Sequence, residues 1–111
     1  MPRAIPDPPP HLATPTAGWW RSVVTTYELD DHHLRLLRLA CEAWDRGQQA
    51  REAIDTEGLT YTDRFDIPRA RPEIAIERDA RIAFARLIRE LGLDSATPAD
   101  PRPPVLRHSR R

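Results

Sequence analysis

Several residue types are missing or scarce in this 111-residue chain, and each shortage excludes a class of protein. Lysine and asparagine are absent, so all seventeen basic residues are arginine, and seventeen acids balance them. A formal net charge of zero excludes a chain that attracts nucleic acid by its overall charge. The single Cys41 excludes a disulfide framework and a multi-cysteine metal site.

Long apolar runs are also missing, and none approaches the roughly 18–20 residues of a membrane span. The start at Met1-Pro2-Arg3 leads into prolines rather than into the apolar core of a signal peptide. Four glycines are too few for a phosphate-cradling loop, and no catalytic motif is present. We therefore expect one small, soluble, intracellular domain that is not an enzyme and holds neither cofactor nor metal.

The twelve prolines gather near the two ends of the chain and suggest how it is divided. We predict a disordered proline-rich arm over residues 1–13, a folded domain over 14–94 and a disordered basic tail over 95–111. Residues 19–94 carry twelve arginines and fifteen acids, whereas the tail carries four arginines and one aspartate. The neutral total therefore conceals an acidic body and a basic tail.

Three helices are predicted within the folded part. The first begins at Thr14, which would cap it, with Pro15 at the first helical position. Its apolar face follows the i, i+3, i+4, i+7 spacing and consists of Trp20, Val23, Val24 and Tyr27.

The second predicted helix is the longest, capped by Asp30 and running to Glu57 before a left-handed stop at Gly58. Its apolar residues cover more than half of the circumference, so we expect it to pack against two neighbours. One stripe holds mostly small residues, which would let a neighbouring backbone approach closely. That stripe includes Leu36, Ala40, Ala43 and Gly47.

The third predicted helix opens at Pro72 and ends at Leu91, with Gly92 at the stop position. The 13-residue connection over 59–71 has room for one extended turn or a small hairpin, and it lets the second and third helices run antiparallel. The predicted fold class is therefore all-α, a short N-terminal helix followed by a long antiparallel helical hairpin.

Histidine and cysteine often act in catalysis or metal binding, but in this chain we interpret them as structural residues. His32 and His33 are adjacent and would point about 100° apart on a helix, so they need a third partner to hold a metal ion. We interpret them as ordinary first-turn residues, with His33 half-buried. Cys41 lies on the apolar face of the second helix, and we interpret it as a core residue rather than a nucleophile. The three tryptophans are likewise expected in the core.

The arginines give the clearest indication of a binding surface. Arg64, Arg69 and Arg71 cluster in the connection, and the tail adds Arg107, Arg110 and Arg111. Because guanidinium groups contact phosphates in pairs of hydrogen bonds, these six are the candidate DNA-binding residues. Such a set would contact phosphates without reading bases. The alternative is that arginine merely replaces lysine throughout the chain.

Several short motifs follow one another in a distinctive order. They are Pro10-His11-Leu12, Trp20-Arg21, Leu29-Asp30, Glu57-Gly58-Leu59, Arg71-Pro72-Glu73-Ile74 and Arg89-Glu90-Leu91-Gly92-Leu93. In this order and spacing the chain resembles the small subunits of phage terminases, the DNA-packaging motors of tailed bacteriophages. The resemblance covers about three-quarters of the chain.

The resemblance implies a non-enzymatic homo-oligomer, a ring that binds double-stranded viral DNA in the host cytoplasm. Such a subunit passes the DNA to the terminase large subunit, which holds the ATPase and the nuclease. For packing within or between subunits we name Leu36, Ala40, Ala43, Gly47, Leu87 and Leu91.

Two other functions remain open at this stage. The acidic body is compatible with a helical-hairpin adaptor that regulates a protein partner and never binds DNA. A helix-turn-helix regulator would need a turn of 3–4 residues, and the 13-residue connection argues against it.

Overall fold

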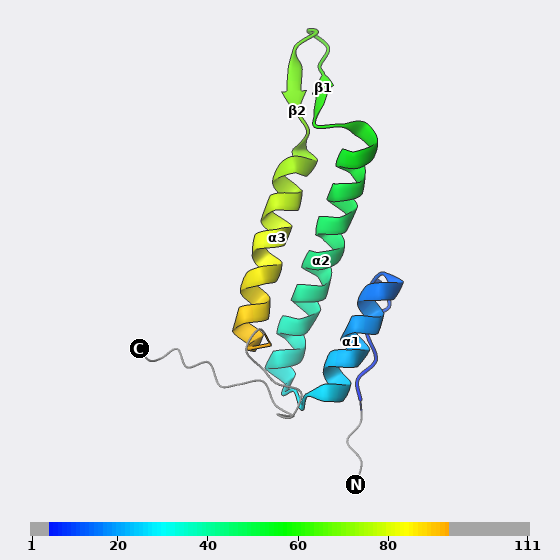
Figure 1. Ribbon diagram of the computed structural model, residues 1–111, viewed down its shortest axis with the longest axis vertical. Helices are drawn as coiled ribbons and strands as arrows, with labels where there is room; N and C mark the ends of the chain where they lie inside the picture. Colours follow the sequence, from blue (N-terminus) through cyan, green and yellow to red (C-terminus); the bar gives the residue numbers. More distant parts are fainter. Residues whose placement is uncertain (1–4, 94–111) are drawn as a thin grey trace, which may run out of the picture.

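The computed structural model describes residues 5–93, which form three helices and a small β-hairpin (Figure 1). The elements in order are α1 (Thr14–Thr26), α2 (Asp31–Glu57), β1 (Thr60–Thr62), β2 (Pro68–Ala70) and α3 (Pro72–Leu91). This architecture confirms the predicted short N-terminal helix and long helical pair. The two-stranded sheet forms within the 13-residue connection.

Helices α2 and α3 lie side by side and run antiparallel, and α1 packs beside the first half of α2 (Figure 1). The small-residue stripe explains how close the pair comes. A Cβ atom built on Gly47 would lie 3.3 Å from the Cβ of Ala80 on α3. The predicted close approach is therefore made by α3 of the same chain.

The core lies at the end of the helical pair where all three helices meet. Its most enclosed side chains are Val24 of α1, Leu37 and Cys41 of α2, and Leu91 of α3, each at most 1% exposed. Burial, with Asp45 and Glu42 adding to it, raises the pKa of the Cys41 thiol to about 12. The prediction that Cys41 is a core residue is confirmed, since its side chain is 0% exposed and belongs to the core cluster.

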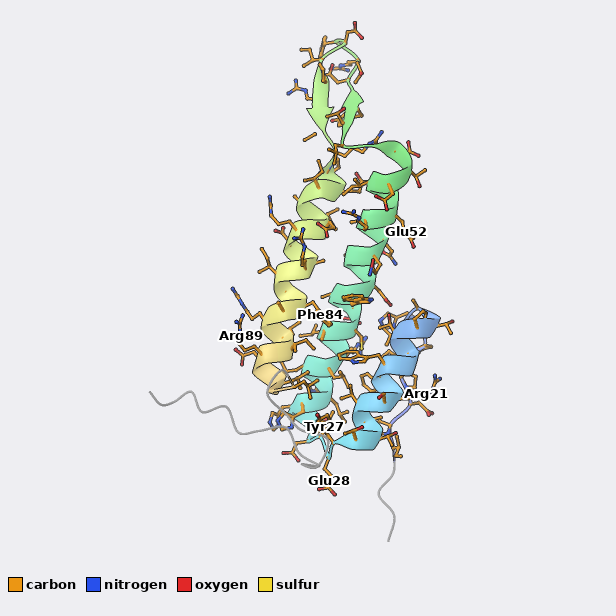
Figure 2. The ribbon with its side chains drawn as sticks, in the orientation of Figure 1. Arg21, Tyr27, Glu28, Glu52, Phe84 and Arg89 are labelled. Carbon is orange, nitrogen blue, oxygen red and sulfur yellow. The ribbon has the colours of Figure 1, made fainter. Side chains whose placement is uncertain are left out.

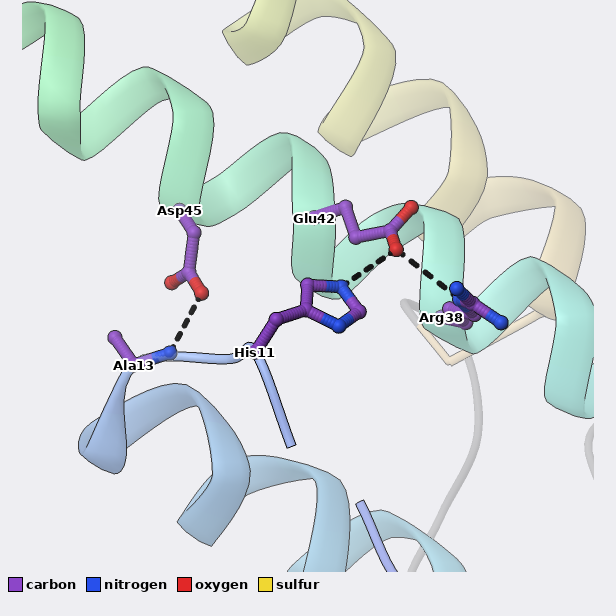
Figure 3. Close-up of polar contacts among 5 residues, drawn as sticks. All are labelled: His11, Ala13, Arg38, Glu42 and Asp45. Carbon is purple, nitrogen blue, oxygen red and sulfur yellow. Dashed lines mark hydrogen bonds and ion pairs between the residues drawn. The ribbon is translucent and has the colours of Figure 1, made fainter. Parts of the chain in front are cut away.

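Residues 5–13 pack against the helices, although the sequence predicts a disordered arm there. Leu12 joins the core, and the Trp20 indole N–H donates a hydrogen bond of 3.0 Å to the carbonyl of Pro6. Figure 3 shows a second anchor, in which Glu42 of α2 accepts from Arg38 at 3.0 Å and pairs with His11 at 2.7 Å. Pattern reasoning missed this packing because the two contacts of the arm join residues 14 and 31 positions apart.

The N-cap of α1 lies one residue earlier than the sequence predicts. Its N-cap is Ala13, and Thr14 is already helical and provides no cap. A carboxylate from α2 replaces that cap, because Asp45 accepts the Ala13 backbone N–H at 2.8 Å (Figure 3) and the Thr16 hydroxyl. The start of α1 is thus stabilised by a neighbouring helix rather than by its own sequence.

The other helix ends agree with the sequence. Asp30 caps α2, and its backbone N–H donates to Nδ1 of the half-buried His33 at 3.2 Å. Gly58 and Gly92 follow α2 and α3 with φ values of 91° and 77°, which glycine adopts without the penalty that a Cβ brings. Within residues 5–93, no helix is both long enough and apolar enough to cross a membrane.

Candidate nucleic-acid interface

The β-hairpin lies at the far end of the helical pair from α1 (Figure 1). Strands β1 and β2 are antiparallel, with Tyr61 opposite Arg69. The loop between them is organised by Asp63, whose Oδ1 accepts the backbone N–H groups of Phe65 at 2.8 Å and Ile67 at 3.0 Å. Asp66 completes the turn with a φ of 66°, a left-handed value that aspartate tolerates better than most residues.

The loop also fixes the first group of predicted DNA-binding residues. Arg69 donates from Nε to Oδ2 of Asp63 at 2.9 Å. This bond, followed by the bond from the Ile67 N–H, lowers the pKa of the Asp63 carboxyl. The Arg64 guanidinium lies 5.0 Å from the centre of the Phe65 ring, within the range of a cation–π contact.

Arg71 sits at the base of the β-hairpin and is the least exposed of the three arginines. Its guanidinium lies 5.9 Å from the Tyr61 ring centre and 3.8 Å from the Glu57 carboxylate. Arg69 and Arg71 therefore each have an acidic neighbour, which reduces their attraction for phosphate. Among residues 5–93, Arg64 is the member of this group without a carboxylate partner. Arg107, Arg110 and Arg111 lie outside the described residues.

Four large apolar side chains on the β-hairpin are also exposed, which sequence reasoning did not anticipate. They are Leu59, Tyr61, Phe65 and Ile67, with Phe65 reaching 67% exposure. Strands of three residues form too small a sheet to bury them. In the sequence, these four apolar residues all stand at odd positions, an alternation that is typical of strands and could have indicated this hairpin. The candidate interface therefore combines apolar contact area with Arg64, which has no carboxylate partner within residues 5–93.

The residues predicted for packing within or between subunits divide into two groups. Ala40 and Leu91 are buried inside the chain, and Gly47 faces Ala80 across the helical pair. These three serve the contacts of α2 with α3 and the core. The other three are only partly buried, namely Leu36, Ala43 and Leu87.

The three tryptophans occupy different environments. Trp20 is buried, as predicted, whereas Trp44 is 46% exposed and does not belong to the core. The rings of Trp19 and Trp44 lie 5.9 Å and 5.1 Å from that of Phe84, which joins them into one aromatic cluster. Figure 2 shows Phe84 on the side of α3 that faces α2, with Arg89 on the opposite side.

The two adjacent histidines come together more closely than the helical spacing suggests. The ring centres of His32 and His33 lie 4.1 Å apart, and their nitrogen atoms lie within 4.8 Å of a carboxylate oxygen of Asp30. Asp30 is thus a third polar side chain beside the pair, which the sequence reasoning did not identify. A cation here would face the positive end of the α2 dipole, and His33 Nδ1 already accepts the cap hydrogen bond.

Comparison with known proteins decides the family. Residues 19–102 match the family described as phage terminase, small subunit. The chain belongs to that family. The match begins in α1, runs through both helices of the pair and the β-hairpin, and continues past the described residues. No curated protein and no solved structure was found to match this small subunit.

Proposed function

We propose that this terminase small subunit is non-catalytic, assembles into a homo-oligomeric ring, and binds double-stranded viral DNA where packaging starts. It then passes the DNA to the large subunit, which carries the ATPase and nuclease, inside the host cell. The family match over residues 19–102 is the observation that carries this proposal.

The proposed DNA contacts are to phosphates. Arg64 leads the set in the β-hairpin because it is exposed and has no acidic partner among residues 5–93, and Asp63 holds its loop in shape. Arg69 and Arg71 would contribute less, since each must share its charge with a carboxylate. Arg107, Arg110 and Arg111 would add contacts from the tail.

Binding of a labelled DNA duplex at several salt concentrations tests this proposal. The logarithm of affinity falls with the logarithm of salt concentration by about 0.9 for each phosphate contacted. Arg64→Gln is therefore expected to weaken binding and to reduce that slope by about 0.9. Replacing Arg107, Arg110 and Arg111 by glutamine should reduce it by roughly three times as much.

Arg86→Gln is the matched control, since Arg86 is exposed on α3 and lies outside the proposed interface. It should change the salt slope by less than Arg64→Gln does. Equal effects of both changes would place the contacts elsewhere. Affinity that ignores salt, or no affinity at all, would favour the adaptor that regulates a protein partner.

For the contacts between subunits we propose two partly buried residues of the predicted set, Leu36 and Leu87. Ala43, the third partly buried member, lines a hollow between α2 and α3 of its own chain. The exposed Leu39 of α2 and Ile82 of α3, at 51% and 53% exposure, extend the apolar surface that a neighbour could cover. Assembly into a ring would bury such side chains without opening the core of each subunit.

A further inference from the structure

An aromatic groove lies between α1, α2 and α3, and nothing in residues 5–93 fills it. A hollow of about 280 Å³ is lined by Pro15, Thr16, Trp19, Trp44 and Phe84. A second hollow, of about 300 Å³, shares Trp44 and Phe84 and continues between α2 and α3. We call the two together the aromatic groove.

The groove offers hydrogen-bond donors as well as ring faces. Neither the Trp19 nor the Trp44 indole N–H has an acceptor among the described residues. An indole N–H that is drawn into an interface normally finds a partner. Aromatic grooves of this kind bind proline-rich segments in the polyproline II conformation, whose ring faces pack on aromatic rings and whose carbonyl groups accept hydrogen bonds.

The same protein already holds one proline-rich segment in this way. Residues 6–10 line a surface with Trp20, and the Trp20 indole donates to the carbonyl of Pro6 at 3.0 Å. Trp20 is 4% exposed as a result of its packing, whereas Trp44 keeps 46% of its surface open. The aromatic groove therefore has the chemistry of the occupied Trp20 site and lacks its occupant.

We propose that the second proline-rich segment of this chain, residues 98–104, binds in the aromatic groove of its own subunit. The segment lies beyond the described residues and contains Pro98, Pro101, Pro103 and Pro104. It would bring a carbonyl group to the Trp44 indole N–H and cover the exposed face of that ring. This inference concerns the subunit itself and does not depend on the proposed DNA contacts.

The length of the connecting chain fits this placement. Leu91 follows Phe84 by seven residues, about two helical turns, so the two side chains lie on the same face of α3. The level of Phe84 lies roughly 14 Å back along the helix from Leu93. At up to about 3.3 Å per residue, the next five residues suffice to bring Pro98 to the groove.

The segment is also long enough to follow the groove. Residues 98–104 in polyproline II conformation would span about 19 Å. The distance along α3 from Phe84 to Glu77, which lines the far part of the groove, is about 10 Å. One proline-rich segment can therefore cover both hollows.

The test is NMR on the ¹⁵N-labelled full chain, which has three indole N–H signals, one for each tryptophan. The signals are assigned with the variants Trp19→Phe, Trp20→Phe and Trp44→Phe. Replacing Pro98, Pro101, Pro103 and Pro104 by alanine should shift the Trp44 indole signal and speed its exchange with water about tenfold. The Trp20 signal should stay in place.

The arm of the same chain provides the matched control. Replacing Pro8, Pro9 and Pro10 by alanine should shift the Trp20 indole signal and leave that of Trp44 unchanged, since those prolines belong to the occupied site. An unchanged Trp44 signal in the tail variant would overturn the proposal. So would a Trp44 signal that depends on protein concentration and ignores the tail prolines, because a second copy would then cover the groove.

A spin label separates the subunit's own tail from a neighbour's. Ser109→Cys supplies the attachment point, since the buried Cys41 thiol with its raised pKa does not compete for the label. The label should broaden the Trp44 indole signal when both are on one chain. Broadening in a mixture of labelled and isotope-enriched chains would assign the tail to a neighbouring groove and overturn the proposal. DNA and the large subunit are absent from both experiments, so failure here leaves the proposed function untouched.

Discussion

The two ends of the α2–α3 pair are held together by different interactions. At the end next to α1, side chains such as Leu37 and Leu91 are fully enclosed. At the other end, every residue of β1 and β2 is exposed, and the loop depends on hydrogen bonds to the single carboxylate of Asp63. The comparison teaches that the enclosed core and the proposed DNA-binding surface lie at opposite ends of the helical pair in this small subunit.

The largest loss of stability is expected when a buried side chain is removed from the core. Leu37→Ala removes a side chain with 0% exposure and should lower the free energy of unfolding by about 2–5 kcal/mol, measured by urea denaturation. Gln49→Ala is the control on the same helix, because Gln49 is exposed and lies outside the proposed contacts between subunits. It should change stability by no more than about 0.5 kcal/mol in either direction. Similar losses from both changes would contradict the position of the core.

The next effect concerns the close contact in the middle of the pair. Gly47→Leu introduces a large side chain at a position where even an added Cβ atom would lie 3.3 Å from the Cβ of Ala80. We expect a loss of about 1–3 kcal/mol in unfolding free energy from overpacking. At Gly18 of α1, nothing lies within 4 Å of an added Cβ. Gly18→Ala should therefore stabilise the protein, by about 0.5–1 kcal/mol in thermal or urea unfolding.

A smaller effect is expected where the arm joins the core end. The bond from Arg38 lowers the pKa of Glu42 below its ordinary value of 4.5, partly opposed by burial and assisted by the bond from His11. The interactions of Glu42, of which the bond from His11 holds the arm, are therefore present in full above pH 4.5. They are lost as the pH falls through the lower pKa of the folded state. Glu42→Gln should remove this part of the pH dependence. This pH dependence is measured from the Trp20 indole N–H signal in NMR, because that group donates to the Pro6 carbonyl of the arm.

The smallest effect on global stability is expected at the β-hairpin. Asp63→Ala removes both backbone hydrogen bonds of the loop, so the Phe65 and Ile67 amides should lose protection in hydrogen exchange while urea unfolding barely changes. In the native chain, the hydrogen bond from Arg69 lowers the pKa of Asp63 below its ordinary 3.8. Loop order should persist above that pH and be lost as the pH falls through the lower value. A large loss of unfolding free energy in Asp63→Ala would contradict the account, because it would show that the β-hairpin and the core unfold together.

The sequence predicts the helices well because their ends are marked locally. Asp30, Gly58, Pro72 and Gly92 each act on the few residues beside them, and the structure keeps all four at helix ends. The predictions differ from the structure where the partner is distant in the chain. Asp45 replaces Thr14 as the partner of the α1 start, and the packing of residues 5–13 depends on Trp20 and Glu42.

The candidate interface could be predicted only in part for the same reason. The clustering of Arg64, Arg69 and Arg71 is visible in the sequence. The structure places Arg64 and Arg69 in the β-hairpin and Arg71 at its base, where it precedes α3. Their unequal availability depends on which carboxylate each one meets, and that follows from the register of the strands and from Asp63. The exposure of Trp44 likewise depends on how α1 packs across α2 and α3.

The most direct test of the central claim is native mass spectrometry of the purified full chain at two ionic strengths. The account predicts one closed species containing more than two copies, which survives moderate salt because apolar contacts hold its subunits together. A monomer that stays monomeric at both ionic strengths, with and without a DNA duplex and the large subunit, would contradict it.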